Sequence, residues 1–277
     1  MHRQRFIITS LLGSYMQSVT VLVANDDGPA SPGVQALITA IAKNANVVPV
    51  IPEGPRSGTS MSLTFHKPLR IREIVVAGCK GYAVSGSPAD AVMVALNRVF
   101  KQRPAVMASG INIGDNTGIQ DVYTSGTVQA AIQSAFLGVP SVAFSMQVVE
   151  GMIFSPADAI GNFSIAAEHA AKVVSWVATH GLPKGVDLLN VNYPINITTN
   201  TRTVFTRLAK KKYDNYIVER LDPRGKPYYW IWGNRVQNYE EGSDAKAVLE
   251  DSLISITPLK VDLSVSASEI NEIIKVL

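Results

Sequence analysis

Residues 19–28 read Val-Thr-Val-Leu-Val-Ala-Asn-Asp-Asp-Gly, an apolar and β-branched run that ends in two adjacent aspartates. An unbroken apolar run of this length is typical of a strand buried on both faces of a parallel sheet. Residues 32–41 open with Pro-Gly and favour a helix, and residues 46–51 favour a second strand. This order predicts a βαβ unit, which is the building block of a parallel sheet with right-handed connections.

The same alternation continues along the chain to about residue 200. We expect further helices over 88–99, 127–137 and 156–180, and further strands over 104–109, 140–145 and 187–191. The predicted fold class is therefore α/β: a Rossmann-like three-layer domain with a mostly parallel sheet, spanning residues 19–200 and carrying the chemistry.

The composition changes after residue 200. Tyr, Trp, Arg and Lys concentrate in residues 210–232, on either side of the turn signal Asp222-Pro223-Arg224-Gly225. This pattern predicts a β-hairpin arm over about residues 207–235, followed by a strand over 252–257 and a terminal helix over 266–277. An apolar ribbon of this kind marks an interface, so we expect residues 201–277 to form the arm and a C-terminal oligomerisation segment of a homo-oligomer.

Composition excludes several classes of protein. Of the 277 residues, 47% are hydrophobic and 17% are charged, which is enough apolar material for a core and too little charge for a disordered chain. The formal net charge of +3 does not favour a nucleic-acid coat or a polybasic membrane binder. A single cysteine, Cys79, leaves no internal disulfide and no cysteine-based zinc site.

The first residues allow two interpretations. A basic head, residues 2–5, and the short apolar stretch of residues 6–16 faintly resemble a signal peptide. We favour the alternative, in which Met16 is the biological start and residues 1–15 are an ill-ordered extension. In the domain organisation, residues 1–18 are the N-terminal extension, disordered or a mis-assigned start, that precedes the domain beginning at residue 19. We also expect no membrane-spanning helix, because no run of about 18 apolar residues occurs, and a cytoplasmic location.

Polar residues follow several of the predicted strands, at the edge where an open α/β sheet binds its ligands. Asp26 and Asp27 repel each other at a buried strand end and need a compensating cation. Ser57 and Asn112 each add a neutral oxygen, which suits Mg²⁺ or Mn²⁺. The simpler alternative is a turn with helix-capping aspartates. Ser57 as a nucleophile is disfavoured, because no histidine is placed to activate it and Pro55 breaks the nucleophile-elbow pattern.

A second cluster of small residues, Thr124-Ser125-Gly126-Thr127, leads into a predicted helix. It is either a plain N-cap or an anion site, because exposed N–H groups and the helix dipole attract phosphate.

In combination and in order, these motifs strongly resemble the SurE family of survival-protein nucleotidases, over roughly residues 19–260. The resemblance is carried by residues 21–33 (VLVANDDGPASPG), 52–64 (PEGPRSGTSMSLT), 86–90 (GSPAD), 109–131 (SGINIGDNTGIQDVYTSGTVQAA), 188–194 (LLNVNYP), Tyr229-Trp230 and 242–259 (GSDAKAVLEDSLISITPL).

The resemblance implies a metal-dependent phosphatase of nucleoside monophosphates, with one divalent ion per subunit. The implied metal ligands are Asp26, Asp27, Ser57 and Asn112, and the implied substrate-binding residues are Ser125, Gly126, Thr127 and Gly110. We expect Asp26 or Asp27 to orient or deprotonate the attacking water and Asn25 to stabilise charge on the phosphoryl oxygens, so these three are the predicted catalytic residues. The family also forms dimers with exchanged C-terminal elements, often paired into tetramers.

The chain departs from the family pattern at Ser31, at Ser87 and in an apparently longer loop between Gly118 and Thr124. That last departure leaves Asp115, Asn116 and Asp121 without assigned roles. Two other functions stay open: a non-catalytic nucleotide-binding or regulatory α/β protein with a structural metal, and, less favoured, a nucleotide-sugar transferase.

Overall fold

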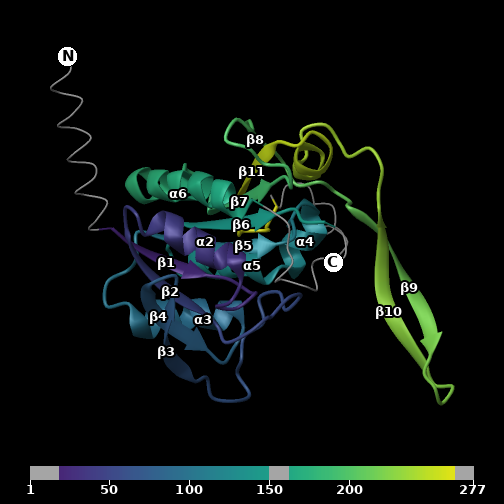
Figure 1. Cartoon of the computed structure of the whole chain (residues 1–277), viewed down its shortest axis with the longest axis horizontal. Helices are drawn as coiled ribbons and strands as arrows, with labels where there is room; N and C mark the ends of the chain where they lie inside the picture. Colours follow the sequence, from purple (N-terminus) through teal and green to yellow (C-terminus); the bar gives the residue numbers. More distant parts are fainter. Residues whose placement is uncertain (1–18, 150–161, 266–277) are drawn as a thin grey trace, which may run out of the picture.

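The computed structural model describes residues 19–149 and 162–265. In this part of the chain, helices cover both faces of a nine-stranded sheet, and a separate two-stranded sheet extends away from it (Figure 1). The strands are β1 (Thr20–Ala24), β2 (Asn46–Pro52), β3 (Ile71–Val76), β4 (Cys79–Val84), β5 (Val106–Ile113), β6 (Ser141–Met146), β7 (Leu188–Tyr193), β8 (Thr203–Phe205), β9 (Tyr213–Leu221), β10 (Pro227–Arg235) and β11 (Ile254–Leu259). The helices are α2 (Pro32–Ile41), α3 (Pro88–Val94), α4 (Gly118–Thr124), α5 (Gly126–Phe136) and α6 (Phe163–His180), with π-helical turns η1 (Ala95–Val99) and η4 (Lys246–Glu250).

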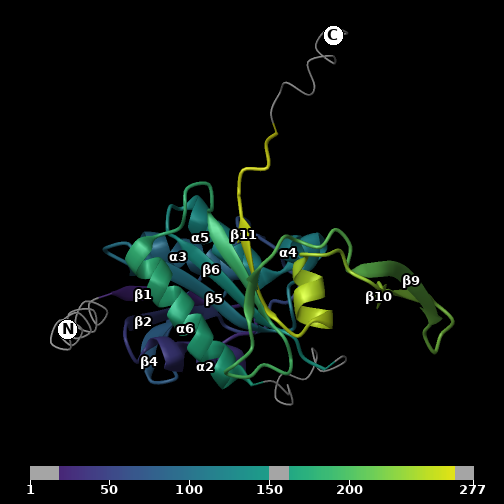
Figure 2. The same ribbon diagram turned by 90° about the horizontal axis from the view of Figure 1, so that it is seen from above.

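The large sheet has the strand order β3-β4-β2-β1-β5-β6-β7-β11-β8. Its central strands, from β4 to β7, all pair in parallel, whereas β3 on β4 and β11 on β7 are antiparallel. Helices α2 and α6 lie on one face, and α3 and α5 on the other (Figure 2). This arrangement confirms the predicted three-layer α/β fold with a mostly parallel sheet.

Strand β1 shows why its sequence is apolar throughout. Val21 and Val23 pack into the core under α2 and α6, while Leu22 and Ala24 pack into the core under α3 and α5, and all four are fully buried. Successive side chains of a strand point to opposite faces, so a strand between two helical layers has no solvent face.

Several elements differ from the predictions. The antiparallel pair β3 and β4 was not predicted, and the segment expected as a loop between Gly118 and Thr124 is the helix α4. Among the described residues, helix α6 begins at Phe163, where Asn162 caps it. The extension (1–18), residues 156–161 of the expected helix and the terminal helix (266–277) lie outside the described residues.

The predicted arm is present as the hairpin of β9 and β10, which projects from the main body (Figures 1 and 2). Its turn lies at the predicted place, where the Gly225 amide donates to the Asp222 carbonyl over 2.9 Å. At the other end, the Val236 amide donates to the Lys212 carbonyl over 3.0 Å. This bond closes the arm root, a name used below for residues 209–215 and 232–236.

Candidate functional site

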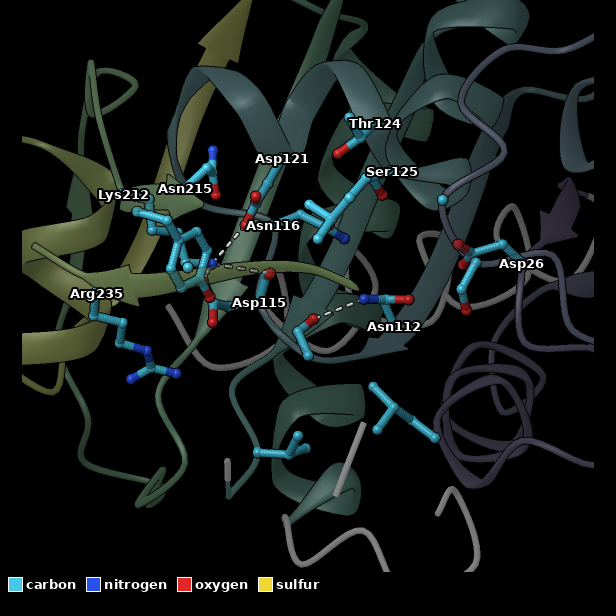
Figure 3. A pocket seen from close by; sticks show the side chains of 18 of the residues that line it. Asp26, Asn112, Asp115, Asn116, Asp121, Thr124, Ser125, Lys212, Asn215 and Arg235 are labelled. Carbon is cyan, nitrogen blue, oxygen red and sulfur yellow. Dashed lines mark hydrogen bonds and ion pairs between the residues drawn. The ribbon is translucent and has the colours of Figure 1, made fainter. Parts of the chain in front are cut away.

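A cavity of about 410 Å³ opens at the carboxyl ends of β1 and β5. One side is formed by strand-end residues and the other by the arm root (Figure 3). The lining residues used below are Asp26, Ser57, Asn112, Asp115, Asp121, Ser125, Lys212, Asn215, Trp232 and Arg235. A cavity at this edge is where parallel α/β sheets bind ligands.

Asp26, Thr127 and Asn112 meet at the strand-end side of the cavity. The Thr127 hydroxyl donates to the Asp26 carboxylate, and it lies 3.5 Å from the Asn112 side-chain oxygen. The Asn112 amide nitrogen donates to the Gly114 carbonyl over 2.7 Å, which turns its oxygen toward Thr127. Asp26 and Asn112, two of the predicted metal ligands, are thus brought together around the Thr127 hydroxyl.

Both adjacent carboxyl groups are poorly solvated. Burial raises the pKa of Asp26 above its ordinary value, although the Thr127 hydroxyl and the backbone N–H groups of Gly126 and Thr127 partly oppose this. Burial, followed by the charge of Asp26, raises the pKa of Asp27 to about 7. Two carboxylates held this close in a dry site favour a bound cation.

Ser57 reaches the same cavity on a loop that is fastened to the end of β1. The Arg56 amide donates to the Asp26 carbonyl over 2.6 Å, and Ser57 itself is exposed on the cavity wall. Further along this loop, the Ser60 hydroxyl donates to the Tyr123 carbonyl over 2.6 Å and the Ser60 amide to the Thr124 carbonyl over 3.2 Å. The Ser57 loop is therefore attached both to β1 and to the end of α4.

The donor set fits a hard divalent cation. It offers two carboxylates and two neutral oxygens, and the buried side-chain oxygen of Asn25 has no hydrogen-bond partner among the described residues. No group of three or more His, Cys, Asp or Glu is placed to hold a metal within residues 19–149 and 162–265. The predicted metal ligands include only two residues of these types, Asp26 and Asp27, so the predicted site is not of the kind that requires three.

The start of α5 has a more specific role than the sequence indicated. Ser125 is the N-cap, and its hydroxyl accepts the Val128 amide over 3.2 Å. Gly126 lies directly against Asp26, since a Cβ at position 126 would stand 2.7 Å from the Asp26 Cβ. The Asp26 carboxylate therefore occupies the helix N-terminus that we assigned to phosphate, and Ser125 is the member of this segment that lines the cavity.

Three further predicted residues, Asp27, Gly110 and Asn25, lie beside the cavity rather than in its wall. The Asp27 carboxylate accepts the Ile113 amide over 3.4 Å and the Ser31 hydroxyl over 3.5 Å. Gly110 is buried in β5, where its φ of +120° and the Phe144 carbonyl, 2.2 Å from a Cβ at position 110, leave no room for a side chain. Asn25 is buried and donates to the Gly28 carbonyl over 2.9 Å, which holds the turn after β1.

Sequence reasoning missed the arm side of the cavity. Lys212, whose side chain is 2% exposed, donates to Asp115 and to Asp121, each over 2.5 Å (Figure 3). In the sequence, the run Lys210-Lys211-Lys212 is typical of a solvated, charged surface segment. Lys212 differs from the other two lysines only in that it directly precedes β9. Asp115 and Asp121 were left without roles, because their partner Lys212 lies 97 and 91 residues further along the chain.

The three charges set each other's ionisation. Burial opposes the charge of Lys212, but Asp115 and Asp121 outweigh it and raise the lysine pKa. Burial likewise opposes the charge of Asp115, but Lys212 and the Thr117 hydroxyl lower its pKa below the ordinary value. For Asp121 burial outweighs Lys212, so the pKa is raised. Lys212 is therefore a permanent buried cation held by two carboxyl groups.

Fold and cavity together define an α/β protein with an oxygen-rich ligand site at its strand ends. The family model described as "Survival protein SurE" matches residues 21–215. The chain belongs to this family.

Named relatives and a solved structure support the same family. The chain is 41% identical to the 5'-nucleotidase SurE of Methanothrix thermoacetophila over 262 residues, covering 93% of this chain and 99% of that one. It is 42% identical to the 5'-nucleotidase SurE of Thermofilum pendens over 257 residues, covering 92% and 96%. The crystal structure of SurE protein from Aquifex aeolicus superposes with a TM-score of 0.77 at 34% identity, covering 92% of this chain and 99% of that one.

Proposed function

We propose that this chain is a metal-dependent phosphomonoesterase that hydrolyses nucleoside monophosphates to nucleoside and phosphate. The observation that carries the proposal is the meeting of Asp26, Thr127 and Asn112 in the cavity at the ends of β1 and β5. Two relatives that the chain matches over nearly their whole length are named 5'-nucleotidase SurE, and this supports nucleoside monophosphates as the substrate class.

Asp26, Asp27, Ser57 and Asn112 would hold one Mg²⁺ or Mn²⁺ ion. Such an ion supplies Lewis-acid polarisation and a lowered pKa for water. The ligand charge of −2 balances the ion, so that a phosphate dianion is not repelled. Asp26 or Asp27 would orient or deprotonate the attacking water.

The remaining residues orient the reacting groups. Asn25 fixes the turn that carries both aspartates, and Thr127 fixes the Asp26 carboxylate in one orientation. Ser125, at the cavity wall and at the N-terminus of α5, is placed to contact a phosphoryl oxygen. Holding a reactant and a catalytic group in register contributes to rate by itself.

The test is hydrolysis of p-nitrophenyl phosphate and of a nucleoside 5'-monophosphate with added Mg²⁺ or Mn²⁺. We expect phosphate release that EDTA abolishes and readdition of metal restores. Binding of the nucleotide without turnover under every metal tested would contradict the proposal and favour a non-catalytic nucleotide-binding protein.

The proposal extends to assembly and location. We propose a homodimer, or a tetramer of two dimers, in which the arm and the segment after β11 contact a neighbouring subunit. Its support is the exposure of large apolar side chains along the arm, among them Ile217, Leu221, Trp230 and Ile231. A cytoplasmic location also remains a proposal. Among the described residues, none of the helices combines the length and apolarity that crossing a membrane requires.

A further inference from the structure

Helix α4 connects the arm root to the residues proposed to bind metal and phosphate. At its start, the Gly118 amide donates to Asp244 over 2.9 Å, and the Ala209 amide donates to the same carboxylate over 2.8 Å. One residue on, the Ile119 amide donates to the Ala209 carbonyl over 2.9 Å. Gln120 accepts the Asn215 side-chain amide over 2.9 Å. The first turn of α4 is thus bonded to the arm root along its length.

Asp121 is the residue where this attachment reaches the site. Its carboxylate accepts a hydrogen bond from the Lys212 ammonium group, and its backbone carbonyl accepts one from the Ser125 amide over 2.8 Å. Ser125 caps α5, which carries Thr127 and hence the hydrogen bond to Asp26. A chain of three contacts therefore runs from the ammonium group of Lys212 to the carboxylate of Asp26.

The far end of α4 leads to the Ser57 loop. The carbonyls of Tyr123 and Thr124 accept both hydrogen bonds of Ser60. A shift of α4 would consequently move the segment at Ser125 and the loop at Ser57 together. Both Ser125 and Ser57 lie on the cavity wall.

Lys212 belongs to the arm root and also forms ion pairs with Asp115 and Asp121. Its backbone closes the arm root through Val236, while its side chain, 2% exposed, is held between Asp115 at 5% exposure and Asp121 at 19%. Charge-assisted hydrogen bonds between buried partners are short and directional, so they fix position more strictly than a surface pair does.

We propose that Lys212 is a positioning residue for phosphoryl transfer: it fixes α4 against the arm root and thereby holds the Ser125–Thr127 segment and the Ser57 loop in register with Asp26. This inference rests on the proposed function for its catalytic readout. It makes the arm a structural part of the subunit's own site, because the residue that closes the arm root also sets the position of α4.

The test uses three variants. Lys212→Met removes the charge at similar length, Asp121→Asn weakens one of the two ion pairs of Lys212 while keeping the lysine, and Lys211→Met is the matched control. Lys211 is the preceding residue and is 62% exposed in an ion pair with Asp214. The double variant Lys212→Met with Asp121→Asn completes the cycle.

We expect Lys212→Met to lower kcat/KM for p-nitrophenyl phosphate by about tenfold or more, with KM raised as well as kcat lowered, because a misplacement of about 1 Å is costly. Asp121→Asn shows a smaller loss of the same kind, and the double variant is no worse than Lys212→Met, since the two act through one contact. A residue that merely stabilises the fold would lower the amount of folded enzyme and leave KM unchanged.

Hydrogen exchange supplies a readout independent of turnover. We expect faster exchange over residues 118–129 in both Lys212→Met and Asp121→Asn, and native exchange in Lys211→Met. If the native chain proves inactive but this exchange pattern appears, the proposed function fails, whereas the role of Lys212 in fixing α4 against the arm root stands. Native kcat/KM or native exchange over 118–129 in Lys212→Met overturns the inference, and if that variant does not fold, Asp121→Asn decides by the same two measurements.

Discussion

Thr127, in the first turn of α5, donates its hydroxyl to the carboxylate of Asp26, which lies 101 residues earlier at the end of β1. The same hydroxyl stands 3.5 Å from the Asn112 oxygen of β5. One small side chain therefore ties a helix terminus to two neighbouring strand ends. If the proposed metal is bound, this hydroxyl decides which Asp26 oxygen is left to bind it.

Thr127→Val keeps the shape of the side chain and removes this donor. Losing a hydrogen bond to a buried charged group costs about 1–3 kcal/mol, which corresponds to roughly a 5- to 160-fold loss in kcat/KM. Steady-state kinetics with p-nitrophenyl phosphate measures the effect, and Thr127→Ser, which retains the hydroxyl, is the control. Equal activity of the Val and Ser variants would remove the hydroxyl from the mechanism.

Asp26→Asn and Asp27→Asn each remove one proposed metal ligand. We expect at least about a hundredfold loss of activity, the size typical of deleting a pre-organised charge. The metal-free variants should stay folded, because burial and mutual repulsion already raise the pKa of both groups. Added Mn²⁺ should raise the Tm of the native chain and not that of the variants. Turnover near the native level in both variants at saturating metal would contradict the ligand assignment.

Gly126→Ala tests the close approach of α5 to β1. The new methyl group would stand 2.7 Å from the Asp26 Cβ and 2.8 Å from its Oδ2. Because both sides are fixed by backbone, we expect a loss of about 1–3 kcal/mol in unfolding free energy, together with a loss of activity. Gly54→Ala is the matched control, since nothing lies within 4 Å of its added Cβ. Urea denaturation of the two variants measures the difference.

His169 gives stability a pH dependence away from the cavity. Its ring nitrogens lie 3.1 Å from the Tyr193 hydroxyl and 3.2 Å from the Thr203 hydroxyl. Burial, followed by the charge of Lys172, lowers its pKa below the ordinary 6.5. The folded state therefore binds fewer protons than the unfolded state, so this contribution is complete above pH 6.5 and is lost as the pH falls toward the folded-state pKa.

His169→Gln should accordingly reduce the fall in unfolding free energy between pH 7.5 and pH 5, as measured by urea denaturation in EDTA. His66→Gln, at an exposed loop residue, is the control. Parallel pH curves for the native chain and His169→Gln would show that the half-buried ring of His169 does not contribute.

The arm prediction concerns assembly. Replacing residues 217–231 by an Asn-Gly turn shortens the hairpin but keeps the arm root and the strand pairs from Tyr213–Arg235 to Tyr216–Trp232. We expect the native chain to sediment as a dimer or larger and the shortened chain as a monomer of lower stability. A native chain that runs as a 29.8 kDa monomer at micromolar concentration would refute the arm interface.

Much of the central sheet could be predicted because burial on two faces leaves a direct mark on sequence. In β1, every side chain from Val21 to Ala24 meets a core, so the run is apolar without interruption. In β3, by contrast, five of six residues are not buried, as befits the edge strand that pairs only with β4. Its pattern, Ile-Arg-Glu-Ile-Val-Val, carries too little burial to predict a strand.

The cavity residues likewise fall into a group that the sequence predicts and a group that it does not. Asp26, Ser57 and Asn112 could be placed together from sequence, because strand ends of a parallel sheet meet at one edge. Lys212 could not, since its burial depends on where the arm root crosses the sheet edge and not on any local pattern. Helix α4 was missed because its seven residues are held by tertiary bonds to Ala209, Asn215 and Asp244 rather than by helix propensity.

The hairpin of β9 and β10 also gives the molecule a built-in optical probe. Two of the three tryptophans of the chain, Trp230 and Trp232, lie on β10 and are 59% and 52% exposed, while the third, Trp176, lies on α6. Indole emission shifts to shorter wavelength when water is removed from the ring. In a Trp176→Phe background, unlabelled fluorescence would report directly on whatever covers the arm, at each protein concentration and in real time.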